Sequence, residues 1–217
     1  MRVFKPHQAI DIIAEYLPEN PIIVEAGAFN GTDSIKMAKQ WPQGTIHAFE
    51  PVPEIYAQLK ENTRDYKNIK TYPLALSDKN GIATFYVAEK KDRPGRPSQA
   101  GSLLAPAQDF TETKMIFSRT IKVKTITLDA WAQENSIAHV DLLWLDMQGK
   151  ELDVLKASTK MINTIKVIFC EINFAKRYQN QFSYQDLMNW AQSHQFRVEA
   201  QDFDEKSKFG NIVLIND

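Results

Sequence analysis

The chain has 217 residues, of which 43% are hydrophobic and 24% are charged. This length and balance are typical of one well-cored globular domain and exclude a disordered or fibrous chain. The formal net charge of -1 provides no global basic field, so a polyanionic partner such as a nucleic acid is disfavoured. The single cysteine, Cys170, excludes an internal disulfide framework and a cysteine-based zinc cluster.

The apolar runs of the sequence are short. The first ten residues, MRVFKPHQAI, lack the apolar core of a signal peptide, and no run elsewhere approaches membrane-spanning length. We therefore expect a soluble, cytoplasmic protein without a membrane span. The sequence leaves the oligomeric state open, and a homodimer is one of the states that it allows.

The first third of the chain alternates between helical and strand-like patterns. An i, i+3, i+4, i+7 stripe of apolar residues predicts an N-terminal helix over 6–17. After Pro18 the pattern becomes βαβαβ, which implies parallel strands with right-handed crossovers. The predicted strands are 22–26, 45–49 and 69–74, and the predicted helices between them are 33–41 and 53–63.

Residues 81–120 interrupt this alternation. The run 81–87 (GIATFYV) alternates in polarity after turn-forming residues, which predicts a hairpin appended to the third strand. The stretch 88–120 is the least regular part of the chain, and we expect it to form a loop or a lid rather than a core element.

The alternation then resumes to the end of the chain. The predicted strands are 121–128, 140–146, 166–171, 196–200 and 211–215, with helices at 128–135, about 150–158 and near 184–194. The pattern allows an antiparallel orientation of the last strand. The prediction is therefore a single Rossmann-like α/β domain over residues 1–217, with a mostly parallel sheet and helices on both faces.

Acidic residues follow almost every predicted strand. In an open parallel sheet, ligands bind beyond the carboxyl ends of the strands, where these residues lie. Carboxylates at such positions need hydrogen-bond donors or cations as partners. The acidic residues therefore predict a ligand rich in donors and positive charge. These residues are Glu25, Glu50, Asp78, Asp146 and Glu171.

The stretch PIIVEAGAFNGTDSI, residues 21–35, distinguishes between classes of ligand. A dinucleotide fingerprint would need glycines at positions 27 and 29 and Gly or Ala at 32, but the chain has Phe29 and Thr32, and it contains no P-loop motif. Both facts disfavour NAD. A sulfonium adenosine cofactor fits better, because the turn amides near Gly27 can approach a zwitterionic amino acid closely. Glu50 can accept ribose hydroxyls, and Asp78 can accept an adenine amino group.

Several ordered blocks of the sequence resemble the FkbM family of class I S-adenosylmethionine-dependent methyltransferases. The blocks are VEAGAFNG at 24–31, FEPVPEIYAQL at 49–59, ALSDKNG at 75–81, GSLL at 101–104, ITLDAW at 126–131 and LLWLDMQGKELDVLKAS at 142–158. The chain departs from the family pattern at Glu25, usually Asp, and in the order Phe29–Asn30. Trp144 and Gln148 stand where the block KIDVEG usually has Lys and Glu.

The resemblance implies a seven-stranded methyltransferase fold and O-methylation of a hydroxyl on a small molecule, natural product, sugar or glycan. It also implies S-adenosyl-L-methionine as the cofactor. We expect the cofactor to contact Glu25, Gly27, Ala28, Phe29, Asn30, Gly31, Glu50, Pro51, Ser77, Asp78, Asp146 and Gln148.

Asp146 and Glu171 are the candidate catalytic residues, because a positioned carboxylate can remove the proton of a hydroxyl nucleophile. They could instead hold a divalent cation, but two carboxylates are too few ligands to assign a metal. Structural alternatives also exist. Asp78 could begin the hairpin turn, Asp146 could cap the following helix, and Glu171 could be buried against Lys176 or Arg177.

The irregular stretch holds the candidate substrate residues. Ser102 lies in the GSLL block, and Arg93 and Arg96 could clamp an anionic acceptor, although solvated positions in a loop are the alternative. None of the four histidines is expected to be the catalytic base. Two other functions stay open: a methyltransferase-like interaction module without turnover, and a NAD-linked oxidoreductase.

Overall fold

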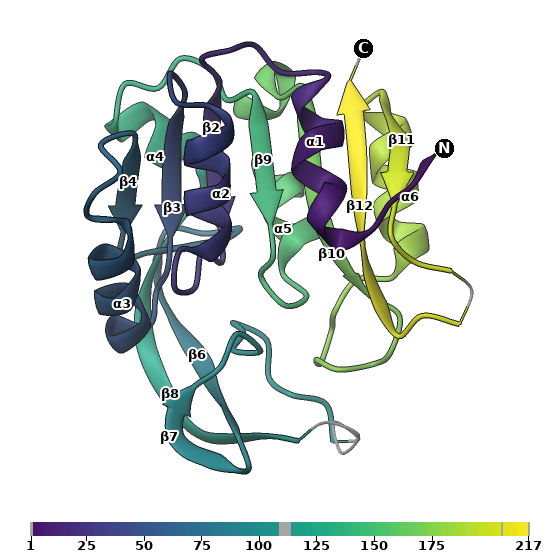
Figure 1. The fold of residues 1–217 in the computed structure, drawn as a ribbon. Helices are drawn as coiled ribbons and strands as arrows, with labels where there is room; N and C mark the ends of the chain where they lie inside the picture. Colours follow the sequence, from purple (N-terminus) through teal and green to yellow (C-terminus); the bar gives the residue numbers. More distant parts are fainter. Residues whose placement is uncertain (1, 109–113, 205, 217) are drawn as a thin grey trace.

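The computed structural model describes residues 2–108, 114–204 and 206–216, which form an α/β fold around one large sheet (Figure 1). This central sheet has eight strands in the order β1-β11-β12-β10-β9-β2-β3-β4. The strands are β1 (Arg2–Val3), β2 (Ile22–Ala26), β3 (Thr45–Phe49), β4 (Ile69–Tyr72), β9 (Leu142–Leu145), β10 (Val167–Asn173), β11 (Phe196–Gln201) and β12 (Phe209–Asn216).

All pairs in this sheet are parallel except those of β12, which runs antiparallel to β10 and to β11. The sheet has one strand more than the seven expected. The additional strand, β1, is only two residues long and pairs with Ala200 and Gln201 at the edge, so no periodic pattern could indicate it. The predicted mostly parallel Rossmann-like fold is confirmed.

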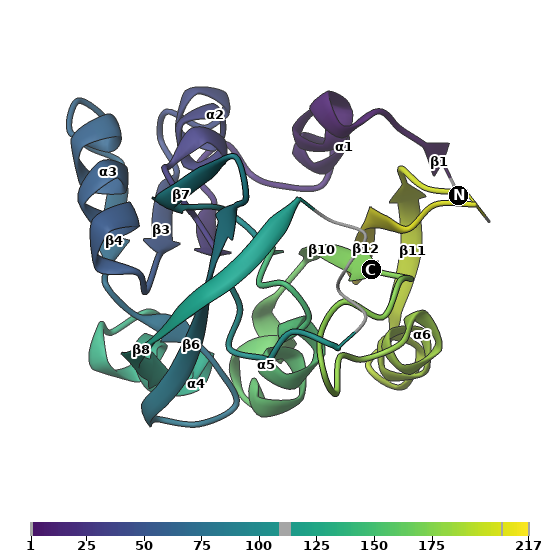
Figure 2. The same ribbon diagram turned by 90° about the horizontal axis from the view of Figure 1, so that it is seen from below.

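Helices cover both faces of the central sheet. They are α1 (Ala9–Ala14), α2 (Thr32–Gln40), α3 (Pro53–Thr63), α4 (Leu128–Glu134), α5 (Glu151–Ala157) and α6 (Tyr184–Ser193), with short 3-10 helices η1 (Pro6–Gln8) and η3 (Met161–Thr164). Figure 2 shows α1, α2 and α3 on one side of the sheet and α4, α5 and α6 on the other. None of the helices in the described parts of the chain is long and apolar enough to span a membrane.

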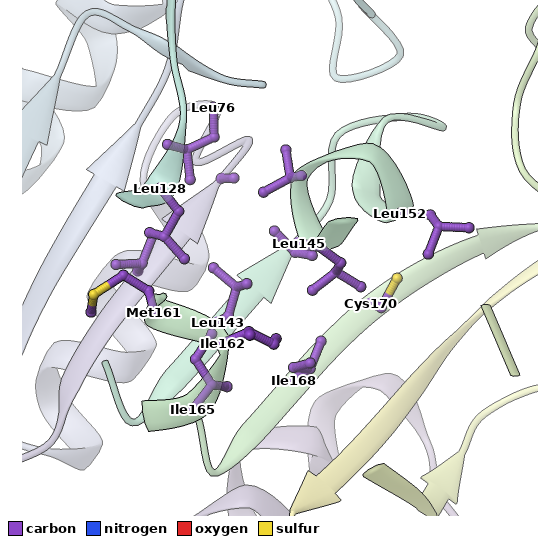
Figure 3. Close-up of a cluster of buried hydrophobic side chains, with 14 of the residues drawn as sticks. Leu76, Leu128, Leu143, Leu145, Leu152, Met161, Ile162, Ile165, Ile168 and Cys170 are labelled. Carbon is purple, nitrogen blue, oxygen red and sulfur yellow. The ribbon is translucent and has the colours of Figure 1, made fainter. Parts of the chain in front are cut away.

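The strand β9 shows why both faces must be covered. Its run of four apolar residues places Leu143 and Leu145 in the cluster that contains residues of α4, α5 and α6. Figure 3 shows these two side chains among their neighbours in the cluster. Leu142 and Trp144 point to the opposite face, where they pack with residues of α1 and α2. Complete burial of such a side chain contributes about 1.5–3 kcal/mol, so the strand is held firmly at the centre of the sheet.

A second, smaller sheet extends from the carboxyl edge of the first (Figure 1). Its four strands have the order β5-β8-β6-β7. They are β5 (Ala75–Leu76), β6 (Gly81–Lys90), β7 (Arg93–Pro97) and β8 (Met115–Ile126). The run 81–87 is a strand, as expected, but it pairs antiparallel with β7 and β8 in this second sheet. The expected hairpin with the third strand is therefore wrong, because within the described residues β4 pairs only with β3.

The expectation that 88–120 is an irregular loop was wrong for much of that stretch. The strand β6 continues to Lys90, β7 spans Arg93–Pro97, and β8 begins at Met115. Residues 109–113 of the expected lid lie outside the described residues. The prolines of β7 misled the prediction, but Pro94 and Pro97 are tolerated because β7 is an edge strand.

The predicted element boundaries are accurate where proline or glycine marks the start of an element. The bounds of β2, β3 and α3 coincide with the prediction. The N-terminal helix is shorter than predicted, because α1 ends at Ala14 instead of continuing to Leu17. Pro18 disfavours helical geometry at the residue before it, which explains an early end.

Candidate functional site

A cavity of about 280 Å³ lies at the carboxyl edge of the central sheet. Residues that follow β2, β3 and β9 line it, and Phe85 and Val87 of β6 line it from the second sheet. Of the predicted cofactor residues, the following line this cavity: Glu25, Gly27, Ala28, Phe29, Asn30, Glu50, Pro51 and Asp146. The structure therefore brings residues from segments more than a hundred positions apart to one cavity.

Gly27 sets the distance between the ends of β2 and β9. Its φ is +88°, and a Cβ atom there would lie 1.9 Å from the carbonyl oxygen of Asp146. The backbone N–H groups of Gly27 and Ala28 both donate to the carbonyl of Phe49, at 3.1 and 3.0 Å. Only glycine allows this approach, so the loop after β2 is fixed against both neighbouring strands.

The rest of the glycine loop leads into α2. Phe29 has a positive φ of 48°, and Gly31, with φ of +85°, is the residue before the first turn of α2. A Cβ at Gly31 would lie 2.8 Å from the side chains of Leu59 and Thr63 in α3. Gly31 does not line the cavity, so its contribution is to allow α2 and α3 to pack closely.

Two buried carboxyl groups, Glu25 and Glu50, face the cavity. Burial raises the pKa of each to about 8. The hydroxyl of Ser34 donates to Glu25, and the backbone N–H of Val52 donates to Glu50 at 2.8 Å. These donors offset only part of the cost of burying charge. A ligand that brings hydroxyl or cationic groups to these oxygens would stabilise their ionised forms.

Asp146 and Glu171, the predicted catalytic pair, lie together at the ends of β9 and β10. The side-chain amide of Gln148 donates from Nε2 to Asp146 Oδ1 at 2.8 Å and to Glu171 Oε2 at 2.6 Å. Burial raises the pKa of both carboxyl groups. The nearby Asp146 raises the pKa of Glu171 further, whereas hydrogen bonding from Gln148 and with Glu171 acts to lower the pKa of Asp146. Asp146 lines the cavity, whereas Glu171 is buried behind Gln148 and does not.

Glu171 is buried and interacts electrostatically with Arg177, as its structural alternative expected. The alternative that Asp146 caps the following helix is not what the structure shows. The N-cap of α5 is Lys150, and it is the buried Glu151 that accepts the backbone N–H groups of Met147 and Gly149. Burial raises the pKa of Glu151 to about 8. Sequence reasoning missed Glu151, although its place in the predicted first turn of α5, directly after the GK pair, was the available signal.

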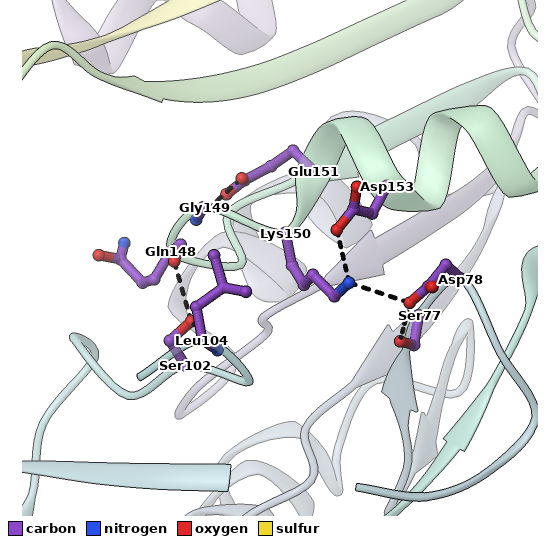
Figure 4. A network of polar contacts seen from close by, with 9 residues as sticks. All are labelled: Ser77, Asp78, Ser102, Leu104, Gln148, Gly149, Lys150, Glu151 and Asp153. Carbon is purple, nitrogen blue, oxygen red and sulfur yellow. Dashed lines mark hydrogen bonds and ion pairs between the residues drawn. The ribbon is translucent and has the colours of Figure 1, made fainter. Parts of the chain in front are cut away.

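Gln148 does not line the cavity, but it connects several segments around it through hydrogen bonds. Its φ is +59°, and its Oε1 accepts the hydroxyl of Tyr178 at 2.9 Å. Its backbone carbonyl accepts the hydroxyl of Ser102 at 2.9 Å, as Figure 4 shows. Ser102 is fully buried and also accepts the N–H of Leu104 at 3.0 Å. The GSLL segment is thus tied to the turn that carries Asp146.

The structure does not place Asp78 on the cavity wall. Lys150 Nζ lies 2.9 Å from Asp78 Oδ1 and 2.5 Å from Asp153 Oδ2, and Ser77 Oγ donates to Asp78 at 3.0 Å (Figure 4). Partial burial acts to raise the pKa of Asp78, but the contact with Lys150 outweighs it and the pKa lies below its usual value. Ser77 also does not line the cavity, whereas Lys150 does.

The remaining candidates lie away from the cavity. Arg93 and Arg96 are exposed on the edge strand β7 and do not line it. His47 is a core residue: its Nδ1 lies 2.9 Å from the hydroxyl of Tyr72, and burial lowers its pKa to about 4. Within the described residues, no group of three or more His, Cys, Asp or Glu side chains is arranged to hold a metal ion.

The chain matches known methyltransferases in sequence and in fold. The family model for the methyltransferase FkbM domain matches residues 25–198. The chain is 26% identical to the 2-O-methyltransferase NoeI of Sinorhizobium fredii, over 85% of this chain and 76% of that protein. It is 24% identical to the hexuronic acid methyltransferase AglP of Haloferax volcanii, over 76% of this chain and 61% of that protein.

The fold is shared with the crystal structure of an rRNA methylase from Streptococcus thermophilus, with a TM-score of 0.54 and 11% sequence identity. That match covers 100% of this chain and 99% of the other, and it shows the class I methyltransferase architecture. Because the family model matches most of the sequence, the chain belongs to the FkbM methyltransferase domain family.

Proposed function

We propose that the protein transfers a methyl group from S-adenosyl-L-methionine to a hydroxyl oxygen of a small-molecule, sugar or glycan acceptor. The observation that carries this proposal is the cavity in which Glu25, Glu50 and Asp146 surround the loop at Gly27. The printed activity of NoeI, a 2-O-methyltransferase, supports oxygen as the methylated atom.

The two ends of the cavity suit different parts of the cofactor. Glu50 lies beyond β3, where its carboxylate can accept the ribose hydroxyls, and Val52 and Ile55 add apolar surface for an adenine ring. Glu25 lies near the end of β2 and the loop at Gly27 follows it, so that a cationic amino group and a carboxylate would meet acceptors and turn amides there. When bound, the cofactor would supply an electrophilic methyl carbon on a sulfonium centre.

Asp146 is the residue we assign as the proton acceptor. It lies between the loop at Gly27 and the turn at Gln148, and it is the member of the carboxyl pair that lines the cavity. The acceptor oxygen bonds to the methyl carbon while the carbon–sulfur bond breaks, and the electron pair of that bond stays on sulfur. The hydroxyl proton passes to the Asp146 carboxylate, so charge and atoms balance.

Gln148 and Glu171 act through Asp146. The Gln148 amide fixes the Asp146 carboxylate by a hydrogen bond of 2.8 Å. Glu171 lies behind the amide, and burial together with the nearby Asp146 keeps its pKa well above its usual value, which favours its neutral form. A neutral Glu171 does not compete with Asp146 as a charged group, and this supports Asp146 as the base.

A methyl-transfer assay tests the proposal. The protein would be incubated with S-adenosylmethionine labelled in its methyl group and with a set of hydroxylated acceptors, and the product bond would be identified by its resistance to base. A base-stable methyl ether that Asp146→Asn fails to form is the expected result. Label in a base-labile ester or on nitrogen would contradict O-methylation of a hydroxyl, and equal turnover by Asp146→Asn would contradict its role as base.

A further inference from the structure

A second cleft, of about 530 Å³, lies on the face of the central sheet that α1 and α2 cover. In Figure 1 the strand β9 is visible in the gap between these two helices. The cleft has one wall at α1, one at α2 and a floor on β9 and β10. Its lining residues are His7, Ile10, Asp33, Lys36, Trp144, Asp146, Phe169 and Asn211.

This cleft meets the cofactor cavity at the candidate base. Four residues line both spaces: Asp33, Lys36, Trp144 and Asp146. An acceptor hydroxyl must reach Asp146 to lose its proton and must reach the transferable methyl group on the same side. The second cleft offers a path to that point that does not cross the cofactor.

The opposite side of the turn that carries Asp146 is already filled. Gln148, Ser102 and Tyr178 are buried there and joined by hydrogen bonds of 2.9 Å. Leu104 packs so closely over Gly149 that a Cβ at Gly149 would lie 3.1 Å from its Cδ1. An acceptor on that side would have to break this packing, so the cleft between α1 and α2 is the favoured approach.

The floor of the cleft is aromatic. The rings of Trp144 and Phe169 stack with centroids 3.7 Å apart and an angle of 16° between planes. Trp144 replaces the lysine that the KIDVEG block usually has at this position. A floor that is cationic in that pattern is therefore flat and apolar in this chain, which suits the C–H face of a saturated ring.

The polar lining suits hydroxyl groups and disfavours an anion. Lys36 Nζ lies 2.7 Å from Asp33 Oδ1, so its charge is paired, and Asp146 adds a carboxyl group. Asn211 donates from Nδ2 to Asp202 at 2.7 Å, which fixes the orientation of its amide at the rim. His7 adds a further donor or acceptor.

We propose that this cleft is the acceptor site and that it takes a neutral, polyhydroxylated ring such as a hexopyranoside in preference to an acidic sugar. The proposal rests on the methyltransferase function proposed above. It assigns recognition to residues of α1, α2, β9, β10 and β12, and it assigns none to Arg93 and Arg96, which lie outside both spaces.

The first test blocks the cleft. Ile10→Trp adds bulk on the α1 wall, and Asp11→Trp adds the same bulk at an exposed neighbouring position of α1 that lines neither space. Methyl transfer to methyl α-D-glucopyranoside would be measured together with calorimetric titration of S-adenosylhomocysteine. We expect Ile10→Trp to lower kcat/KM by about tenfold or more with unchanged S-adenosylhomocysteine affinity, and Asp11→Trp to match the wild type.

The outcomes separate the two proposals. Failure of well-folded wild type to bind S-adenosylhomocysteine would overturn the proposed function itself. Normal binding with equal turnover by wild type and Ile10→Trp, or with no transfer to the neutral glycoside at all, would overturn the acceptor site alone.

The second test introduces a positive charge into the floor of the cleft. Trp144→Lys restores the lysine of the family block, and the ratio of kcat/KM for methyl α-D-glucopyranoside to that for methyl α-D-glucuronoside would be compared with the wild type. We expect the wild type to prefer the neutral glycoside and the variant to move the ratio toward the charged one. Because a ratio between acceptors is independent of cofactor affinity, an unchanged ratio, or a wild-type preference for the glucuronoside, would overturn the proposal.

Discussion

Replacing Gln148 by methionine should change the pH dependence of methyl transfer more than its maximum. The Gln148 amide donates to Asp146 at 2.8 Å and to Glu171 at 2.6 Å, and methionine keeps the length of the side chain but offers no donor. Burial raises the pKa of Asp146, and the hydrogen bond from Gln148 opposes that rise. Its loss therefore favours the protonated form.

The magnitude follows from the strength of the lost bond. A hydrogen bond to a charged group contributes about 1.5–3 kcal/mol, and each 1.36 kcal/mol corresponds to about a tenfold change in ionisation. At a pH where Asp146 is only partly ionised, the variant should hold roughly 10- to 100-fold less of the carboxylate. Since the base is the carboxylate, kcat/KM falls by the same factor there and recovers as the pH is raised.

The assay is the pH profile of kcat/KM for methyl transfer, with Gln185→Met on the exposed side of α6 as the matched control. Gln148 does not line the cavity, so S-adenosylhomocysteine affinity should stay near the wild-type value. An acidic limb that moves to higher pH is the predicted result. A uniform loss at every pH would refute the reasoning, because it would indicate a general disturbance of the site, and so would an unchanged profile.

Three further predictions concern the cofactor cavity and its cover. Burial raises the pKa of Glu50 from 4.5 to about 8, so its contribution to folding stability is present below pH 4.5 and is lost as the pH rises through 8. In Glu50→Gln this loss is absent, so the free energy of unfolding should fall across this range by less than in the wild type, with a difference of at most about 5 kcal/mol. The absence of this difference would show that Glu50 is not buried in the free protein. Gly27→Ala should lose at least about 2 kcal/mol of stability, because φ is +88° and the added Cβ would lie 1.9 Å from Asp146 O; wild-type stability in urea would contradict the close approach of β2 and β9. Ser102→Ala removes the buried hydroxyl bonded to Gln148 and should cost about 1–3 kcal/mol, with faster hydrogen exchange at the Leu104 amide. Protection at that amide equal to the wild type would exclude the role of Ser102 as an anchor.

Local sequence pattern was sufficient for the elements that build the site. β2 and β3 were predictable because each is a short apolar run bounded by Pro or Gly and ended by an acid, and α3 because it begins at a proline. The acids at the ends of these strands met in one cavity because parallel strands bring their carboxyl ends to a common edge.

Contacts between distant segments were the part that pattern could not supply. The strand character of 88–90 and 115–120 depends on the pairing of β6 with β8, two segments that are far apart in the sequence. The role of Gln148 depends on a left-handed backbone and on Tyr178, thirty residues away. His7 lines the second cleft only because α1 packs beside α2, which no local motif indicates.

The central claim is that the cavity beyond β2 and β3 binds an adenosyl sulfonium cofactor through Glu50. Calorimetric titration of the wild type and of Glu50→Gln with S-adenosylhomocysteine, with NAD as the control ligand, tests it most directly. We predict tight binding of S-adenosylhomocysteine by the wild type, marked weakening in the variant, and no binding of NAD. A well-folded wild type that binds NAD, or that binds S-adenosylhomocysteine as tightly with Glu50→Gln as without it, would contradict the claim.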